Sequence, residues 1–378
     1  MIAKIFPHLT PQPDLDGQLK GVRYFDIRKL TEYECFRLMD VDPEDARMLC
    51  DSPLLSKSAR YKLAGNSIVV SCLYHIFRQI WFPTPTQREP SLFADMEPEW
   101  RVPLPDTIRM VTLCSGYDSQ ALAMRRLCAE HQGAQFDLSA WAEFDPESKR
   151  LVAEQPAVIA HNILFPQWAD RNLGDMTKID WAAWRKEHPD EVDLLTYSTP
   201  CQSISQAGKR EGIAKGSGTR SAVLWYTEEA IRALRPKFLL QENVRALCNK
   251  VNQPDFEEWQ QVCTDCGYDN YWTIMNAKNY GIPQNRERVF MLSVRKDLQL
   301  PPFTFPEPFK LTSEVADILE ENVSQAYYLN PENVIKFLQA NEDEKGQGII
   351  YRHTDRKYSD EELAEIRSNA LRHEGQTE

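Results

Sequence analysis

Long apolar runs are missing from this sequence of 378 residues, and so is an excess of basic charge. No stretch approaches the roughly 18 to 20 uninterrupted apolar residues of a membrane helix. The opening residues MIAKIFPHLTPQ also lack the basic start and long apolar core of a signal peptide. We therefore expect a cytoplasmic chain with no membrane partner. Lys and Arg number 44 against 56 Asp and Glu, a net charge of −12, which disfavours a protein that coats nucleic acid by bulk charge.

The cysteine and histidine content argues against disulfides and metal. Nine cysteines, an odd number, fit a reduced compartment better than a disulfide framework. Cys263 and Cys266 form one Cys-x-x-Cys pair, but the seven histidines offer no second pair of ligands nearby, so we expect no metal site. With 42% hydrophobic and 26% charged residues and no internal repeat, the composition is that of a folded chain large enough for two domains.

Composition shifts along the chain suggest its organisation. Residues 28–82 predict a compact block that ends in a helix, since apolar residues recur at helical spacing, namely Ile68, Val69, Cys72, Leu73, Ile76, Phe77 and Ile80. Residues 83–107 carry too many prolines for a helix or a central strand and predict a linker. The polar end beyond about residue 300 is too poor in apolar residues to form a core alone.

From residue 108 onward, short apolar runs alternate with helix-like stretches. The runs IRMVTLC, AQFDLSAWAEFD, VDLLTYSTP, KFLLQENV and RVFMLSVRK predict strands, and segments such as SAVLWYTEEAIRALR predict helices between them. This alternation is typical of an α/β fold with a doubly wound, mostly parallel sheet. Ligands of such sheets bind beyond the carboxyl ends of the strands, so the residues that follow each apolar run are the candidates for function.

Cys201 directly follows Pro200 at one strand end. The glycine-punctuated loop after it contains Lys209, Arg210, Lys215 and Arg220, and nearby cations stabilise a reactive thiolate. Taken alone, Cys201 could equally be a small buried hydrophobe, as most free cysteines are.

Two further strand ends offer charged groups. Glu242 and Asn243 close the run KFLLQENV, where a desolvated carboxyl would have a raised pKa and could share a proton with a ring nitrogen; Glu242 could also cap the next helix. Arg286 and Arg288 alternate through Glu287 and can lie on one face. They could hold carbonyl oxygens or phosphates, or form surface ion pairs.

The first three strand ends outline a nucleoside site. Ser115 and Gly116 let the backbone approach a ligand before the next helix. Glu143 ends the second run and is placed to bind a ribose diol. Asp175 ends the region expected to supply a third strand and could approach an adenine. Together these residues outline a site for an adenosine-containing cofactor.

In this order, LCSGYDS, AEFD, GDM, STPCQS, QENV and QNRERVF resemble the motifs of the cytosine-5 DNA methyltransferases. The resemblance implies a Rossmann-like S-adenosyl-L-methionine-dependent methyltransferase fold with a small target-recognition region. It also implies methyl transfer from that cofactor to carbon 5 of cytosine in double-stranded DNA, by addition of the cysteine to carbon 6 of a flipped-out base.

The resemblance assigns roles residue by residue. It implies the catalytic residues Cys201, Glu242, Arg286 and Arg288. It implies cofactor contacts from Asn66, Ser67, Ile68, Cys114, Ser115, Gly116, Tyr117, Glu143, Phe144, Asp175, Met176 and Pro200. The expected DNA contacts are Gln202, Ser203, Lys209, Arg210, Lys215 and Arg220.

The motif order is unusual for this family. RKLTEYECFRLMDVD and YKLAGNSIVV resemble its last two motifs, yet they lie at the front. We therefore expect a circular permutation, with residues 28–82 completing a catalytic domain of residues 108–310. The target-recognition region would be split between residues 1–27 and 311–378, the latter of which could instead be a polar tail.

Two departures keep alternatives open. In the cofactor loop, Cys114 stands where the family usually has an aromatic residue, and Asp118 and Ser119 stand where it has glycines. The split target-recognition region is also short and acidic for reading DNA in the major groove. The alternatives are a tRNA cytosine-5 methyltransferase, a weakly active or inactive subunit whose partner chain supplies target recognition, and a generic α/β binding protein with a buried cysteine. A restriction endonuclease of the same system is a further expected partner.

Overall fold

The computed structural model describes residues 28–83, 100–200, 214–217 and 220–328. The chain forms two compact units, Met1–Thr31 with Leu319–Glu378, and Glu32–Ile318. In the smaller unit, the Lys29 amide donates to the Tyr327 carbonyl at 2.9 Å, and Arg28 forms an antiparallel bridge with Tyr328. The sheet and the candidate site belong to the larger unit.

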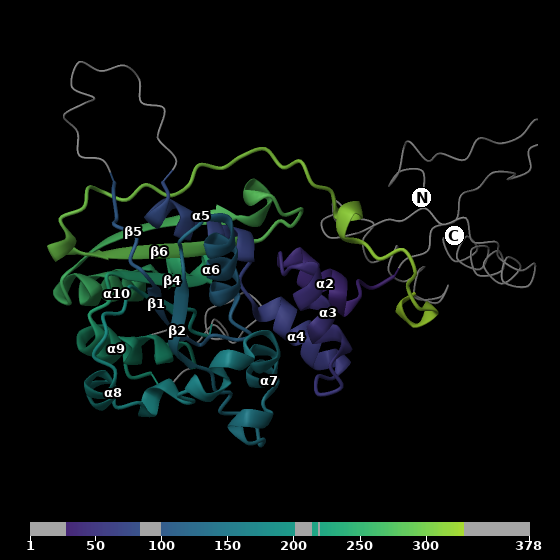
Figure 1. The fold of residues 1–378 in the computed structure, drawn as a ribbon, viewed down its shortest axis with the longest axis horizontal. Coiled ribbons are helices and arrows are strands. Elements are labelled where there is room, and N and C mark those ends of the chain that lie inside the picture. Colours follow the sequence, from purple (N-terminus) through teal and green to yellow (C-terminus); the bar gives the residue numbers. More distant parts are fainter. Residues whose placement is uncertain (1–27, 84–99, 201–213, 218–219, 329–378) are drawn as a thin grey trace, which may run out of the picture. The chain divides into compact units, whose positions relative to one another are not determined.

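Six strands form the central sheet of the larger unit (Figure 1). They are β1 (Ile108–Leu113), β2 (Phe136–Ala142), β3 (Leu194–Tyr197), β4 (Phe238–Val244), β5 (Tyr268–Asn276) and β6 (Glu287–Arg295), in the order β2-β1-β3-β4-β6-β5. The pairs β1–β2, β1–β3 and β3–β4 are parallel, and β6 runs antiparallel to both β4 and β5. The predicted doubly wound, mostly parallel α/β sheet is confirmed.

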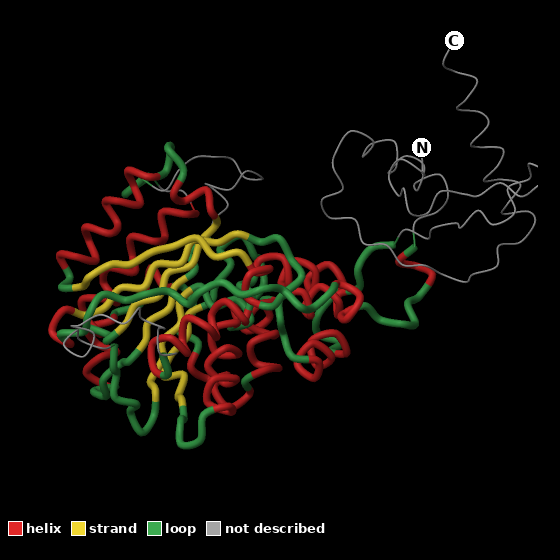
Figure 2. The backbone as a smooth tube through the Cα atoms, turned by 90° about the horizontal axis from the view of Figure 1, so that it is seen from above, coloured by secondary structure: helices red, strands yellow, loops and turns green. Residues whose placement is uncertain are grey.

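Helices cover both faces of the sheet (Figure 2). The hydrophobic core on one face includes buried residues of α2 (Glu32–Leu38), α3 (Pro43–Asp51), α4 (Lys57–Asn66), α5 (Val70–Trp81), α6 (Ser119–Glu130) and α7 (Pro156–Leu164). The core on the other face includes buried residues of α8 (Trp181–Glu187), α9 (Thr227–Leu234) and α10 (Gln253–Asp265). Because strand side chains alternate between faces, Met110 joins the first core and Val111 the second. Burial on both faces explains why the central strands read as continuous apolar runs.

Short 3-10 helices connect these elements. They are η3 (Val152–Glu154), η4 (Pro166–Arg171), η5 (Met176–Lys178), η6 (Arg220–Tyr226), η7 (Arg245–Cys248), η8 (Ala277–Tyr280), η9 (Lys296–Leu298), η10 (Val315–Ile318) and, in the smaller unit, η11 (Gln325–Tyr327).

The helix expected at the end of the N-terminal block is present as α5. Its periodic apolar residues are buried, and it packs beside α6, which directly follows the first strand and its loop. Its neighbour α4 begins at a cap in which the Ser56 hydroxyl accepts from the Ala59 amide at 3.2 Å. The segment between α4 and α5 is thereby brought to the ends of the sheet strands.

Two features differ from expectation. The region that ends at Asp175 supplies only an isolated bridge between Trp141 and Asn172 instead of a third strand. β5, a strand at the edge of the sheet, was not expected because its sequence YDNYWTIMN forms neither a regular polar–apolar alternation nor a continuous apolar run. Of the expected linker, residues 100–107 carry neither helix nor strand, and residues 84–99 lie outside the described part.

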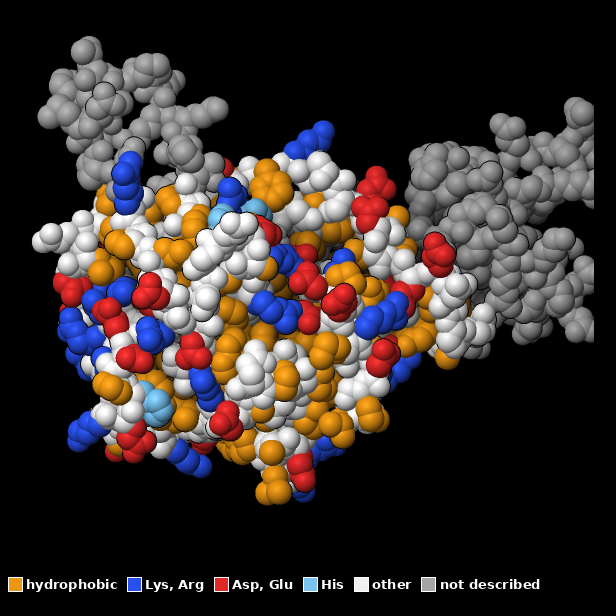
Figure 3. All heavy atoms as spheres, in the orientation of Figure 1, with side chains coloured by type: hydrophobic (Ala, Val, Ile, Leu, Met, Phe, Trp, Pro, Cys, Tyr) orange, Lys and Arg blue, Asp and Glu red, His pale blue; other side chains and the backbone are white. Residues whose placement is uncertain are grey.

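Charged side chains of both signs lie on the surface of the described residues. On the face shown in Figure 3, acidic and basic side chains of the described residues are interspersed. No helix within the described ranges is long and apolar enough to cross a membrane. The same residues contain no group of three or more His, Cys, Asp or Glu side chains arranged to hold a metal ion. Cys263 lies fully buried on α10.

Candidate active site

A cavity of about 280 Å³ lies beyond the carboxyl ends of β1 to β4, where a doubly wound sheet binds its ligands. The start of β6 and the segment between α4 and α5 complete its walls. Most described candidate residues share its lining: Asn66, Ser67, Ile68, Cys114, Ser115, Gly116, Tyr117, Glu143, Phe144, Pro200, Glu242, Arg286 and Arg288. Residues as far apart in sequence as Asn66 and Arg288 therefore meet at one site.

The loop after β1 turns sharply beside the cavity. Cys114, Gly116 and Asp118 all have positive φ angles, of 52°, 60° and 68°. A Cβ added at Gly116 would meet no atom within 4 Å, so backbone conformation and not space favours glycine there. The Gly116 amide donates to Glu143 Oε2 at 2.8 Å. The first two strand ends are thus joined by a hydrogen bond between backbone and carboxylate.

The segment between α4 and α5 is bound to this loop and to the start of β6. The Tyr117 hydroxyl donates to Ser67 Oγ at 2.7 Å, and burial raises the pKa of Tyr117 to about 12. The Arg286 guanidinium donates to the carbonyl oxygens of Gly65 and Ser67, at 2.9 and 2.7 Å. Arg286, expected to be catalytic, therefore also holds the backbone of the cavity wall.

A buried ion pair joins β4 and β6 in the lining of the cavity. Arg288 Nε is 3.1 Å from Glu242 Oε1, and Glu242 is only 9% exposed. Burial raises the pKa of Glu242, and the neighbouring charges of Arg288 and Arg286 partly oppose that rise. The carboxyl group thus holds a proton more readily than an exposed glutamate does.

The backbone that leads to Cys201 is held at three successive residues. Ser198 Oγ donates to the Cys114 carbonyl at 3.2 Å, and Asn243 Nδ2 donates to the Thr199 carbonyl at 3.2 Å. Ser221 Oγ donates to the Pro200 carbonyl at 2.6 Å. The backbone of residues 198–200, which directly precedes Cys201, is therefore held in place at the cavity.

The remaining candidates either do not line the cavity or lie outside the described residues. Asp175 and Met176 do not line it; the Asp175 carboxylate accepts from Thr177, and Met176 Sδ lies 3.6 Å from Cys114 Sγ. Cys201, Gln202, Ser203, Lys209 and Arg210 lie outside the described residues. Lys215 is 3.5 Å from Glu228 and lies over the Trp225 ring, and Arg220 begins η6.

Sequence reasoning missed other cavity residues. Gln120 lines the cavity and donates to Ser198 Oγ at 3.4 Å, and Lys62 lies 3.7 Å from Asp145 at its edge. Gln155 also lines it and donates to the Asp145 carbonyl. Lys62 and Gln120 lie in helices, and Gln155 precedes one, so no pattern in the sequence distinguishes them from ordinary polar residues.

The cavity brings a strand-end carboxylate, Glu143, and a buried carboxyl–guanidinium pair, Glu242 with Arg288, to the edge of the sheet where α/β folds bind their ligands. The family model described as C-5 cytosine-specific DNA methylase matches residues 108–377. The chain therefore belongs to the C-5 cytosine-specific DNA methylase family, and the resemblance drawn from the motifs is confirmed.

Individual relatives match over shorter stretches. The type II methyltransferase M2.ScrFI of Lactococcus lactis subsp. cremoris is 44% identical over 165 residues, 44% of this chain and 44% of that protein. The orphan methyltransferase M.SssI of Spiroplasma monobiae is 39% identical over 150 residues, 39% and 37% of the two chains. The match thus spans less than half the length of these curated relatives.

Among solved structures, that of the S. pombe Dnmt2 methyltransferase covers 69% of this chain and 81% of its own, with 17% identity and a TM-score of 0.44. A similarity at that level does not bear on function.

Proposed function

We propose that this protein transfers the methyl group of S-adenosyl-L-methionine to carbon 5 of cytosine in double-stranded DNA. The observation that carries the proposal is the cavity in which the Glu242–Arg288 pair faces the loop of Gly116 and Glu143. Family membership supports the same chemistry. We call Pro200, Glu242, Asn243 and Arg288 the base wall of the cavity. We call Asn66, Ser67, Ile68, Gly116, Tyr117 and Glu143 its cofactor wall.

The cofactor wall fits an adenosine. The Glu143 carboxylate ends a strand where such folds bind a ribose diol, the Phe144 ring lines the cavity beside it, and the Gly116 loop allows close backbone approach. S-adenosyl-L-methionine, when bound, supplies an electrophilic methyl group. Cys114, Ser115 and Ser67 would keep the backbone of the cofactor wall in the conformation that the cofactor contacts. Asp175 and Met176 would contact the cofactor only by moving toward the cavity.

The base wall fits a cytosine ring. Carbon 5 of cytosine is a poor nucleophile, so the Cys201 thiolate first attacks carbon 6, forming a carbon–sulfur bond and an enamine. Carbon 5 of the enamine would then accept the methyl group as its bond to the sulfonium of S-adenosyl-L-methionine breaks, leaving S-adenosyl-L-homocysteine. Loss of the carbon 5 proton restores the double bond and expels the thiolate.

Glu242 and Arg288 offset the charge that develops during this addition. A carboxyl group with a raised pKa can share its proton with ring nitrogen N3 and accept from the exocyclic amine. Arg288, within 3.1 Å of that carboxylate, can donate to the O2 carbonyl.

Access to both faces of the ring requires the base to leave the duplex, at a cost of a few kcal/mol. Gln202, Ser203, Lys209, Arg210, Lys215 and Arg220 would contact the DNA around the flipped nucleotide. Lys215 can leave Glu228 cheaply, since exposed ion pairs contribute only about 0–1 kcal/mol. With a net charge of −12, binding should depend strongly on these few cations and on salt.

We also propose the circular permutation. The family model begins matching at residue 108, yet Asn66, Ser67 and Ile68 complete the cofactor wall from upstream. A closing helix that packs beside the first strand can be joined to it by a linker without changing the core. The domain boundaries at 27, 82, 107 and 310 are part of this proposal. A partner chain would then supply target recognition. One of the two relatives is named a type II methyltransferase and the other an orphan methyltransferase, so these names do not indicate whether a restriction endonuclease accompanies this protein.

Trapping on a modified base tests the nucleophile, the base and the substrate together. Duplex DNA containing 5-fluorocytosine is mixed with the protein and S-adenosyl-L-methionine and run on a denaturing gel. Fluorine cannot leave as a proton does, so the thioether to carbon 6 should persist as a covalent adduct. The adduct should vanish in Cys201→Ala, while that variant still binds DNA.

Matched arms separate the alternatives. An adduct with 5-fluorocytosine tRNA and none with DNA would replace the proposed substrate by RNA. Adduct formation retained in Cys201→Ala would exclude this nucleophile. No adduct with either nucleic acid, despite measured cofactor binding, would favour a subunit that needs a partner.

A further inference from the structure

The loop after β1 contains an aspartate in a conformation that usually favours glycine. Asp118 has φ 68° and ψ 63° and is fully buried. Asp reaches the left-handed region more easily than most residues because its short polar side chain can hydrogen-bond locally. The contacts of this side chain therefore decide whether the loop keeps its shape.

The Asp118 carboxylate binds both ends of the turn. Oδ1 accepts from the Ala121 amide at 2.9 Å, which caps α6, and Oδ2 accepts from Thr112 Oγ1 at 2.8 Å. Thr112 Oγ1 in turn lies 2.8 Å from Ser115 Oγ, and the Asp118 amide donates to the Ser115 carbonyl at 2.8 Å. One carboxylate thus ties the end of β1, the loop and the start of α6 together.

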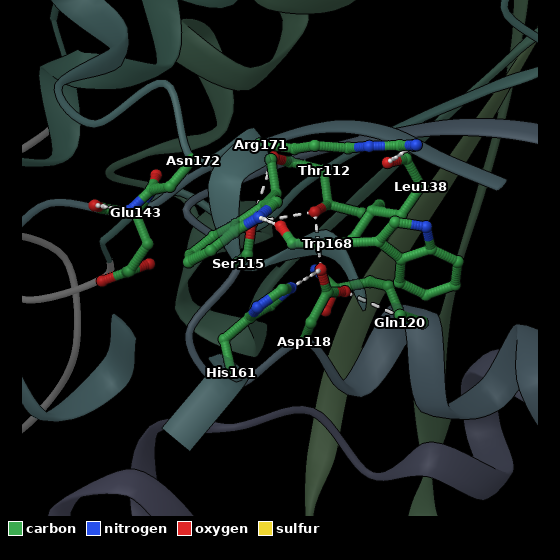
Figure 4. Close-up of polar contacts among 12 residues, drawn as sticks. Thr112, Ser115, Asp118, Gln120, Leu138, Glu143, His161, Trp168, Arg171 and Asn172 are labelled. Carbon is green, nitrogen blue, oxygen red and sulfur yellow. Dashed lines mark hydrogen bonds and ion pairs between the residues drawn. The ribbon is translucent and has the colours of Figure 1, made fainter. Parts of the chain in front are cut away.

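His161 of α7 faces the same carboxylate from behind the loop. In Figure 4 the two side chains point toward one another, and His161 Nε2 lies 3.6 Å from Asp118 Oδ2. The ring is fully buried and stacks on Trp141, with centroids 3.6 Å apart. Neither ring nitrogen of this buried side chain has a hydrogen-bond partner, so Asp118 is the polar group toward which it is directed.

This network ends at the cofactor wall, although neither Asp118 nor His161 lines the cavity. Ser115 donates its amide to the Ala142 carbonyl at 3.3 Å, and Gly116 donates to Glu143. Trp141, which holds the His161 ring, lies in β2 two residues before Glu143. A shift of the loop would move the Gly116 amide away from the Glu143 carboxylate.

We propose that Asp118 and His161 are a positioning pair that holds residues 115–118 in the shape that binds the cofactor. This inference rests on the proposed cofactor and goes beyond it, since it assigns the loop's preorganisation to two buried residues outside the cavity. A glycine would adopt this backbone conformation at little cost. In Asp118, the hydrogen bonds of the carboxylate offset the cost of the same conformation. His161 keeps that carboxylate oriented toward Thr112.

The test is a double-mutant cycle on cofactor affinity. Asp118→Asn, Asp118→Gly, His161→Gln and Asp118→Asn/His161→Gln are compared with the unaltered chain by calorimetry with S-adenosyl-L-methionine. Asp118→Asn should weaken binding roughly tenfold, and adding His161→Gln to it should weaken binding little further, because contacting residues are non-additive. Asp45→Asn is the matched control. Asp45 of α3 is also buried and pairs with Arg125 of α6, the helix that Asp118 caps, but this pair does not involve residues 115–118.

A second readout needs no cofactor. Hydrogen exchange of the peptide covering residues 114–121 should be faster in Asp118→Asn and His161→Gln than in Asp45→Asn, at temperatures where all remain folded. A purely structural role would lower the Tm of all three variants alike and leave cofactor affinity and loop exchange at control values; that result would overturn the pair.

Failure of the proposed function is recognisable separately. If the unaltered chain does not bind S-adenosyl-L-methionine, the cofactor assignment fails, and exchange in the loop alone decides whether the pair holds it. If Asp118→Gly does not fold, Asp118→Asn and His161→Gln carry the test.

Discussion

In the base wall the charged groups belong to two neighbouring strands, β4 and β6, whereas the cofactor wall is assembled from three separate parts of the chain. The register of β4 and β6 pairs Glu242 with Phe290 and Val244 with Arg288. Glu242 and Arg288 are therefore diagonal neighbours on one face of the sheet. Their ion pair follows directly from the antiparallel ladder.

The cofactor wall has no such ladder. The α4–α5 segment is held at the cavity by Tyr117 and by two donations from Arg286 to the carbonyls of Gly65 and Ser67. The loop after β1 is held by isolated contacts: the Gly116 and Ser115 amides donate to Glu143 and to the Ala142 carbonyl, and the Asp118 carboxylate accepts from Thr112 and Ala121. We infer that damage to the base wall should affect the chemical step, and damage to the cofactor wall should affect binding.

The largest expected effect comes from the base wall. Glu242→Gln should lower kcat by about 10²–10³-fold, as the loss of a group that stabilises transition-state charge does. Cofactor affinity measured by calorimetry should stay unchanged, because Glu242 lies on the opposite wall. If Glu242→Gln lowered cofactor affinity as much as it lowers kcat, the two walls would act as one functional unit, contrary to this prediction.

The pH dependence of turnover sharpens this assignment. Because burial raises the pKa of Glu242, its proton is present at pH values where an exposed glutamate has lost it. Turnover that uses this proton should fall as pH rises through the raised pKa. In Glu242→Gln the amide does not titrate, so that fall should be missing from the kcat/KM profile. A profile with the same alkaline limb in both proteins would assign the limb to another group.

An intermediate effect is expected at the junction of the walls. Arg286→Met removes both donations to the α4–α5 segment and should weaken S-adenosyl-L-methionine binding by roughly 10- to 100-fold, as lost hydrogen bonds to charged groups do. At saturating cofactor, kcat should fall much less. Arg286→Lys can restore one donation and should recover part of the affinity.

The opposite pattern at Arg286 would be equally informative. Unchanged cofactor affinity with a large loss of kcat would make Arg286 a catalytic residue of the base wall, as its motif suggests.

The same contrast explains what could be read from the sequence. Glu242 and Asn243 end an apolar strand, so the sheet rules alone predict that they lie at the ligand-binding edge. Arg288 lies instead at the start of β6, and it reaches the same edge because β6 runs antiparallel to β4. The role of α5 was legible in its apolar spacing, but no local pattern encodes the bond from Arg286 to a carbonyl more than two hundred residues upstream. Family resemblance, and not periodicity, linked residues 66–68 to the cofactor.

Other differences between expectation and structure have equally local causes. Asp175 caps its own 3-10 helix at Thr177, a use of Asp that competes with ligand binding and cannot be told from it in sequence. β5 is an edge strand with several exposed residues, so its apolar signal is weak. Asp118 was noted as a departure from the glycine pattern, and only its contacts with Thr112, Ala121 and His161 reveal how the loop tolerates it.

The smallest effect concerns α5, the helix that follows residues 66–68 of the cofactor wall. His75 packs against Tyr280 and Phe309, and burial, with Arg78 adding to it, lowers the pKa of His75 from 6.5 to about 4. The folded protein therefore binds this proton less well than the unfolded chain, so the stabilisation is complete above pH 6.5 and is lost as pH falls toward 4. His75→Phe cannot charge, and between pH 7 and pH 5 its Tm should fall by roughly 1–3 °C less than that of the unaltered chain. Identical losses of Tm in the two proteins would show that His75 does not cause the acid sensitivity. If His75→Phe also retains cofactor binding better at pH 5, the protonation of His75 affects the cofactor wall as well as stability.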